Sequence, residues 1–211
     1  MIRQLRPLGL ALALAAGVAF AAPALAEAEG FNKPGFEAAL AAAKAHEADV
    51  DFAWLRHQNL LRLDYAIPDW DKADEAFGEI DTRPQKALDL AREQLALNYF
   101  DLFAHVVSEQ SLTKLGQTEA AKAEHATVVA LLASIVGGKD GLSAEHAFTV
   151  VSISEEYQTL ALIGLDVKNQ AFANTDDGHA YDVLEASDPD TGETHKIWFG
   201  IDAFFSKELA Q

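Results

Sequence analysis

The stretch VVALLASIVGGKDGLSAEHAFTVVSI, residues 128–153, is where the chain changes from helical to strand character. Its first nine residues are almost wholly apolar, which is typical of a buried helix, and Gly137 and Gly138 supply a helix end. The residues of 147–153 are rich in β-branched side chains, which favour a strand. We therefore expect helices before Gly141 and a sheet after it.

Several segments before this stretch show apolar residues at helical spacing. The pattern predicts a first helix over 34–46, and Asp51 can cap a second helix that ends at Leu61. The segment 64–81 is interpreted as a loop with a brief helical piece over 72–77.

A long helical region follows this loop. Pro84 is well placed at a helix start, and the apolar face continues for many turns, with a bend or break expected near His105. Gly116 ends the segment, and Thr118 can cap the next helix. The turn at Gly116 resembles a tetratricopeptide hairpin. Because the motif occurs once, we expect a helix pair within one globular domain rather than a solenoid.

The last third of the chain carries strand patterns. Ser154 and the two acids after it can start a helix that Gly164 ends, although the apolar segment 157–165 is equally compatible with a strand. Strands are expected over 170–174, 180–186 and 196–201, followed by a helix over 203–209.

The predicted fold class is α+β. A helical part over about 31–138, which contains the tetratricopeptide-like hairpin, precedes a mainly antiparallel sheet with a short helix over about 142–211. We expect residues 27–211 to form a single domain.

The N-terminus has the three parts of a secretory signal peptide. Arg3 and Arg6 precede an apolar run over 8–22, and Ala24-Leu25-Ala26 is a small-residue cleavage site. The alternative is a membrane anchor, but the run is shorter than the roughly 20 residues that a bilayer requires. We expect cleavage of residues 1–26 and a periplasmic or secreted product.

The composition restricts the partners and the chemistry. The chain carries a formal net charge of -17, and loss of the two leader arginines would make it more negative. Such a surface repels phosphate backbones and anionic lipid, so we expect no nucleic-acid partner and no membrane partner after signal cleavage. The chain contains no Cys, which excludes thiol nucleophiles and zinc-thiolate sites.

Several short motifs, taken in order, resemble the bacterial domain of unknown function family DUF4919. They are Asp51-Phe52 with Leu55-Arg56, Leu115-Gly116, Lys139-Asp140-Gly141, Ala147-Phe148, Glu155-Glu156-Tyr157, Tyr181-Asp182 and Ile197-Trp198-Phe199. The sequence departs from the family pattern at Lys139, where Gly is usual, and at Gly200, where an acid or Asn is usual. The resemblance implies a secreted or envelope protein with an α+β fold, and it implies no mechanism.

One candidate site is a stripe of metal-ligating side chains. Asp101, His105 and Glu109 are spaced four residues apart, so on a helix they would project from one face. Carboxylate and imidazole groups bind hard and borderline cations, and an acidic surface would recruit a divalent metal. The alternative is that these residues are the solvated face of an amphipathic helix.

A second candidate site is Glu155-Glu156-Tyr157 after the first strand. Paired carboxyl groups with a phenol can provide acid and base catalysis. The alternative is that acids in a first helical turn interact with the helix dipole, and adjacent helical residues point about 100° apart.

Two classes of function follow. The first is a non-catalytic binding module for a peptide or another envelope or extracellular protein, with no cofactor. The second is a metal-dependent hydrolase that uses Asp101, His105 and Glu109. A further hypothesis is that a sheet edge at 180–186 pairs with a second copy of the chain.

Overall fold

The computed structural model describes residues 30–62, 70–176 and 178–208. The predicted signal peptide, residues 1–26, lies outside these ranges. The helices are α1 (Lys33–Lys44), α2 (Phe52–Leu60), α3 (Ala73–Glu79), α4 (Pro84–Leu97), α5 (Leu102–Lys114), α6 (Thr118–Val136), α7 (Ile153–Leu162) and α8 (Asp202–Glu208).

The sheet has the strand order β1-β4-β3-β2. Its strands are β1 (Phe148–Thr149), β2 (Asp166–Asn174), β3 (Ala180–Ser187) and β4 (Thr194–Gly200). Strand β1 runs parallel to β4, whereas β4, β3 and β2 form antiparallel neighbours. The predicted α+β class, with a helical part before a mainly antiparallel sheet, is confirmed.

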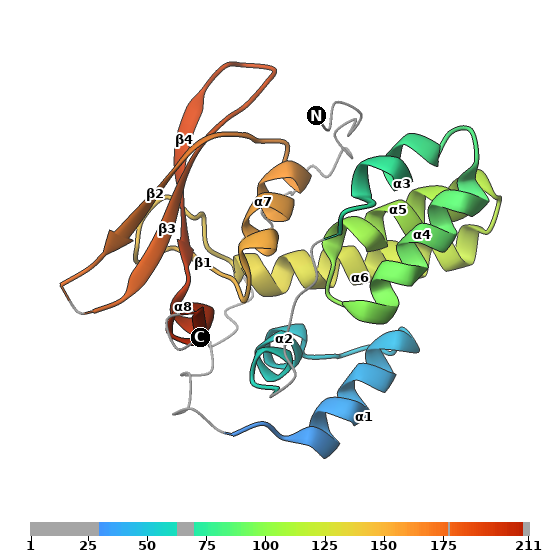
Figure 1. The fold of residues 1–211 in the computed structure, drawn as a ribbon, viewed down its shortest axis with the longest axis horizontal. Coiled ribbons are helices and arrows are strands. Elements are labelled where there is room, and N and C mark those ends of the chain that lie inside the picture. Colours follow the sequence, from blue (N-terminus) through green and yellow to red (C-terminus); the bar gives the residue numbers. More distant parts are fainter. Residues whose placement is uncertain (1–29, 63–69, 177, 209–211) are drawn as a thin grey trace.

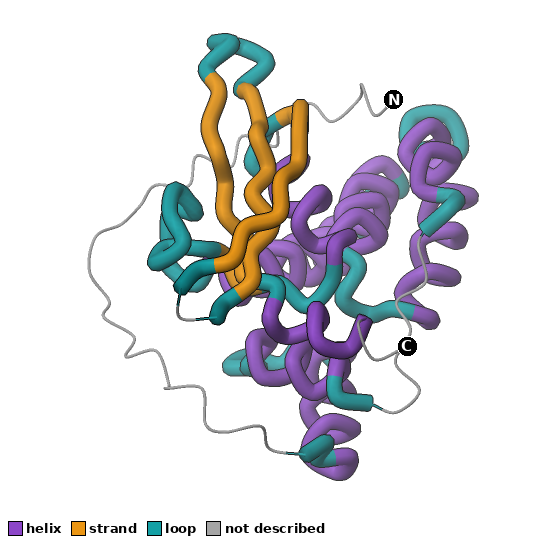
Figure 2. Tube along the Cα trace, turned by 60° about the vertical axis from the view of Figure 1, so that its left-hand side comes forward, coloured by secondary structure: helices purple, strands orange, loops and turns teal. Residues whose placement is uncertain are grey.

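The strands lie at one side of the molecule and most of the helices at the other (Figure 1; Figure 2). Helix α7 lies between the sheet and the helical part (Figure 1). In the sequence, this ten-residue helix lies between β1 and β2 and so interrupts the strand region. It brings the residues of α7 close to both halves of the fold.

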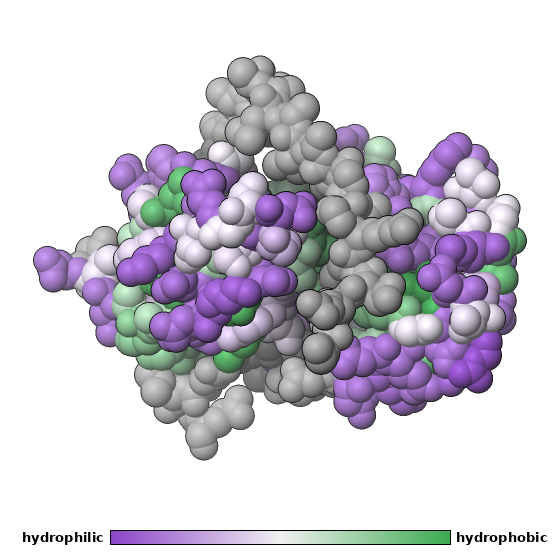
Figure 3. All heavy atoms as spheres, turned by 90° about the horizontal axis from the view of Figure 1, so that it is seen from above, coloured by the Kyte–Doolittle hydropathy of each residue, from purple (hydrophilic) through white to green (hydrophobic). Residues whose placement is uncertain are grey.

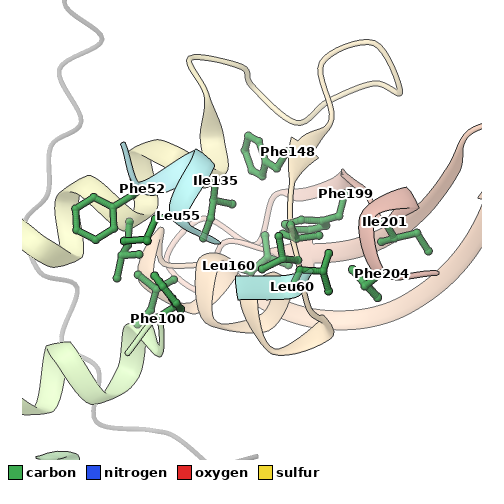
Figure 4. Close-up of a cluster of buried hydrophobic side chains, with 14 of the residues drawn as sticks. Phe52, Leu55, Leu60, Phe100, Ile135, Phe148, Leu160, Phe199, Ile201 and Phe204 are labelled. Atoms are coloured by element: carbon green, nitrogen blue, oxygen red, sulfur yellow. The ribbon is translucent and has the colours of Figure 1, made fainter. Parts of the chain in front are cut away.

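One hydrophobic cluster joins the two halves (Figure 4). Phe52, Leu55 and Leu60 of α2 belong to the same buried cluster as Leu160 of α7 and Phe199 of β4. Burial of a large apolar side chain contributes about 1.5–3 kcal/mol to stability, so this shared core couples the helical part to the sheet.

Two separate helices replace the predicted long one. The chain leaves α4 at Asn98, whose backbone is extended, and α5 begins only after Asp101. Both side chains accept backbone hydrogen bonds, Asn98 from Phe100 N at 3.1 Å and Asp101 from Ala104 N at 3.0 Å. The break therefore lies before His105. It lies there because these two side chains accept hydrogen bonds from backbone N–H groups that have no partner within a helix.

Other local predictions differ in detail. The N-cap of α6 is Gln117 and makes no side-chain cap bond, so Thr118 is the first helical residue instead of the predicted cap. The strand expected over 147–153 is confined to β1. The following segment forms α7, which settles the open choice over 157–165 in favour of a helix.

Seen from above, the described residues present a mainly hydrophilic surface (Figure 3). Among the described residues, no helix combines the length and the apolar character needed to cross a membrane.

Candidate functional site at helix α7 and the sheet edge

Helix α7 begins at a capped N-terminus. Ser152 has an extended backbone, and its hydroxyl accepts a hydrogen bond from Glu155 N at 3.3 Å. The next four polar side chains, at positions 155–158, extend from the helix in different directions because consecutive residues are about 100° apart. Each of them interacts with a different part of the fold.

Glu155 forms a buried ion pair with Arg56 of α2. The Arg56 side chain donates to both carboxylate oxygens, from Nε at 2.8 Å and from a terminal nitrogen at 2.6 Å, which is a bidentate geometry. Val151 N donates to the same carboxylate at 2.9 Å. Glu155 is therefore held by the protein itself and joins α2 to α7.

Arg56 makes two further bonds in the interior. It donates to the Thr149 carbonyl oxygen at 3.0 Å and to the Ser134 hydroxyl at 3.1 Å. This buried guanidinium thus connects α2, α6, β1 and α7. Its contacts indicate a structural role for Arg56.

Glu156 points toward the sheet and has no exposed surface. Its carboxyl group lies close enough to that of Asp182 on β3 to influence the Asp182 pKa. The pair of acids that the sequence placed at Glu155 and Glu156 is formed instead by Glu156 and Asp182, and it is buried.

Tyr157 continues this network toward the surface. Its hydroxyl donates to Gln170 Oε1 on β2 at 2.6 Å, and Gln170 Nε2 donates to Asp182 at 2.9 Å. Burial raises the pKa of Asp182 and also the pKa of Tyr157. Tyr157, at 40% exposure, and the exposed Gln170 are the accessible members of the network, beside the sheet edge.

Gln158 links α7 to the start of α5. Its side chain accepts from Leu102 N at 3.0 Å and donates to Asp101 at 3.2 Å. Asp101 also accepts from Gln94 at 2.9 Å, and burial raises the pKa of the Asp101 carboxyl group. Asp101 is therefore a buried helix cap, not part of an exposed helical stripe.

The other two residues of the predicted metal stripe also bind protein groups. His105 is buried, with Nδ1 2.6 Å from Glu124 and Nε2 2.7 Å from the Tyr99 carbonyl oxygen. Glu109 lies 3.1 Å from His125, and burial raises the pKa of its carboxyl group.

The structure does not assemble Asp101, His105 and Glu109 into a ligand set. In the parts of the chain that the structure describes, no group of three or more His, Cys, Asp or Glu side chains is arranged to hold a metal ion. The proposal of a divalent metal remains a prediction that elemental analysis of the purified protein tests.

Strand β2 forms a free edge of the sheet. Within the described ranges it pairs with β3 alone, whereas β3 pairs with both β2 and β4. The hypothesis that 180–186 is the free edge is therefore wrong, because those residues form a central strand. The available edge is Asp166–Asn174, and seven of its nine side chains are exposed.

The second half of β2 lacks the usual protection of an edge strand. The pairing register shifts between Val167 and Asn169, which marks an irregularity in the first half. From Asn169 to Asn174 the pairing with β3 is regular, and the sequence NQAFAN contains no charge and no Pro. Natural edge strands are normally protected by charges, Pro or bulges. Within this six-residue run Gln170 N donates to Asn169 Oδ1 at 3.0 Å, and the rest of the run is open to pairing with another strand.

One exposed aromatic side chain belongs to this run and a second lies beside it. Phe172 of β2 is 49% exposed and stacks on Phe205 of α8, with ring centroids 5.1 Å apart. Tyr157 of α7 reaches Gln170 on the same strand. A segment added to β2 would therefore meet both backbone groups and aromatic surface.

Sequence reasoning missed three residues of this arrangement. Arg56, Gln170 and Asp182 complete the network. Arg56 lies 99 positions from its partner Glu155, and Gln170 lies 13 positions from Tyr157 and 12 from Asp182. Two of them, Arg56 and Asp182, stand in the motifs that carried the family resemblance, which is the one signal that marks them.

Comparison with known proteins identifies a family. No curated protein and no solved structure matches the chain significantly. The model of the domain of unknown function family DUF4919 matches residues 73–209, which includes α3 to α8 and the whole sheet but neither α1 nor α2. The chain therefore belongs to the DUF4919 family.

Proposed function

We propose that the protein is an exported, non-catalytic binding module that takes up an extended segment of another envelope or extracellular protein at the edge of β2. Strand addition at a sheet edge is a common mode of peptide recognition, in which backbone hydrogen bonds supply affinity. The observation that carries the proposal is the uncharged, regularly paired and exposed run Asn169–Asn174.

The state of the acids on α7 supports a binding role over catalysis. Both oxygens of Glu155 are held by Arg56, and Glu156 has no exposed surface through which a substrate could approach it. A general acid or base must reach the proton that it transfers. The tetratricopeptide-like character of the α5–α6 hairpin remains a prediction, and the proposal does not depend on it.

Strand addition has a direct readout in backbone hydrogen exchange. The probe is a ten-residue peptide with Thr and Val alternating at six central positions and Ser pairs at both ends. Amides of Asn169–Asn174 that exchange rapidly in the free protein should become protected when the peptide binds, because they gain hydrogen bonds.

Two N-methylated forms of this peptide are matched controls. In an extended peptide the N–H groups of alternate residues point to opposite sides. In the first form, methyl groups replace the N–H hydrogens that point toward β2, so they block pairing. In the second form, the same number of methyl groups is shifted by one residue and points away from β2. One form should lose binding and the other should retain it. Equal binding of both forms, or protection elsewhere than in β2, contradicts strand addition.

The export part of the proposal rests on the N-terminal sequence. Removal of 1–26 would make Glu27 the first residue of the mature protein. Intact mass measurement on protein from the native cell should give the mass of residues 27–211. A mass that still includes residue 1 would contradict export by cleavage.

A further inference from the structure

The charge pattern along the sheet edge indicates which segments it accepts. The uncharged run Asn169–Asn174 is followed two residues later by the exposed Asp176 and preceded three residues earlier by the exposed Asp166. Both ends of the edge therefore carry acid, and the centre carries none.

The neighbouring turn adds acid to the first of these ends. Asp166 is paired with Ser187, the last residue of β3, and the turn after Ser187 contains Asp188, Asp190 and Glu193. Backbone N–H groups, that of Asp190 first, lower the pKa of the Asp188 carboxyl group. Lys168 lies 3.7 Å from Asp166 and offsets one of these charges, so the end remains acidic.

This pattern disfavours pairing of β2 with a second copy of itself. An antiparallel pair centred on Gln170 would place Asp166 opposite Asn174 of the other copy, two residues from its Asp176. A parallel pair would place Asp166 beside Asp166. Like charges at paired positions are unfavourable, and each copy also carries a net charge of -17.

We infer that β2 selects an extended segment with an uncharged centre of about nine residues, the length of 167–175, and Lys or Arg at both ends. This inference rests on the proposed strand addition and names the partner of the same edge. Basic ends would lie against Asp166 and Asp176, while the neutral centre pairs with the residues between them, which are Lys168 and the run Asn169–Asn174 with one neighbour at each side. Acidic ends would be repelled, so the same charges give affinity and specificity.

The test compares three peptides that share a centre of nine alternating Thr and Val residues and that carry Lys, Ser or Glu pairs at both ends. At low ionic strength the peptide with Lys ends should bind about tenfold more tightly than that with Ser ends, and the peptide with Glu ends about tenfold more weakly. The differences should shrink in about 0.5 M salt, because exposed charges are screened.

Two double variants locate the effect. Asp166→Asn with Asp176→Asn should bring the affinities for Lys and Ser ends close together. Asp89→Asn with Glu119→Gln removes the same charge from α4 and α6, far along the chain from the edge, and should leave the preference unchanged. Hydrogen exchange of β2 shows whether each variant remains folded.

The outcomes separate this inference from the proposed function. Equal binding of the three peptides by the wild-type protein, with β2 protected in each complex, overturns the charge preference and leaves strand addition standing. Protection of β2 by none of the peptides overturns both. A dimer in sedimentation experiments with β2 amides protected in the absence of peptide also overturns the inference, because the edge would then be occupied by a second copy.

Discussion

Arg56 and Glu155 form a charge pair in the interior of the protein. The guanidinium lies 2.6 Å from the carboxylate, and both side chains are almost fully buried. Removing one member of a buried pair leaves the other charged and without its partner, which costs far more than loss of a surface pair.

Arg56→Met should lower the free energy of unfolding by about 3–5 kcal/mol, because it leaves the Glu155 carboxylate buried beside apolar groups. Urea unfolding followed by circular dichroism measures the change. Arg56→Met combined with Glu155→Leu should recover much of the loss, since no charge then remains in the interior.

Lys72→Met is the surface control. Lys72 lies 2.9 Å from Glu93, but both side chains are about half exposed or more, so the change should be much smaller. A similar effect of Lys72→Met and Arg56→Met would show that the burial of the Arg56 pair has no special importance.

Asp182 makes stability depend on pH in a defined direction. Burial raises the pKa of this carboxyl group above its ordinary value of 3.8, so the folded state binds the proton more tightly than the unfolded state. The stability that Asp182 contributes is present below pH 3.8 and is lost as the pH rises through the raised pKa.

Asp182→Asn should therefore become more stable relative to the wild-type protein as the pH rises from about 3.8 toward neutrality. Urea unfolding of both proteins across this range measures the difference. Asp188→Asn should show the opposite sign in a lower range, below about pH 3.8, because backbone N–H groups lower the pKa of Asp188 and its contribution is lost as the pH falls. The same unfolding series is therefore extended below pH 3.8 for this variant. The same slope for both variants would contradict the assignment of burial as the cause at Asp182.

At the scale of secondary-structure elements, the break between α4 and α5 depends on one buried helix cap, Asp101. The carboxylate of Asp101 accepts from Ala104 N and from the amides of Gln94 and Gln158. This single side chain ends the α4–α5 connection and also holds α7 against α5.

Asp101→Ala should lower the free energy of unfolding by at least about 2 kcal/mol, because it removes the cap and leaves two buried amide donors without their acceptor. Asp101→Asn keeps the backbone acceptor and should cost less. Asp51→Ala removes an exposed cap of α2 that accepts from Trp54 N at 2.9 Å, and should cost about 1 kcal/mol. Thermal unfolding of the two variants compares these losses. A larger loss of stability for Asp51→Ala than for Asp101→Ala would contradict the role of the buried amides.

At the scale of the whole molecule, the family segment is smaller than the folded unit. The family model matches 73–209, but Arg56 of α2 neutralises Glu155, and Phe52, Leu55 and Leu60 of α2 belong to the main core. The part of the chain before residue 73 therefore completes the interior of the part after it.

A fragment that begins at residue 73 should fail to unfold cooperatively, because it exposes the core that α2 covers and leaves Glu155 without its cation. A fragment of residues 30–211 is the matched control and should unfold as the mature protein does. Calorimetry and limited proteolysis measure both. A sharp thermal transition for the shorter fragment would show that α1 and α2 are dispensable.

The elements themselves could largely be predicted from local sequence. The helices over 34–46 and up to Leu61, the cap at Asp51 and the three longer strands agree with the structure. The position of the α4–α5 break was misplaced, because Asn98 and Asp101 act through hydrogen bonds that a pattern of apolar residues does not reveal.

The candidate site was predicted much less well, for a physical reason. Glu155, Glu156 and Tyr157 were singled out, but their partners Arg56, Asp182 and Gln170 come from α2, β3 and β2. Spacing along the chain reports which side chains share a face of one element, and it does not report which element lies opposite.

The sequence by itself determined the fold class, the family and most element boundaries, because these depend on local propensity, periodicity and turn chemistry. Only the tertiary structure decided that β3 is central and β2 free, that the acids of α7 are buried, and that Asp101 and His105 serve the interior. Those outcomes depend on strand order and on long-range packing, which are set by contacts between segments far apart in the chain.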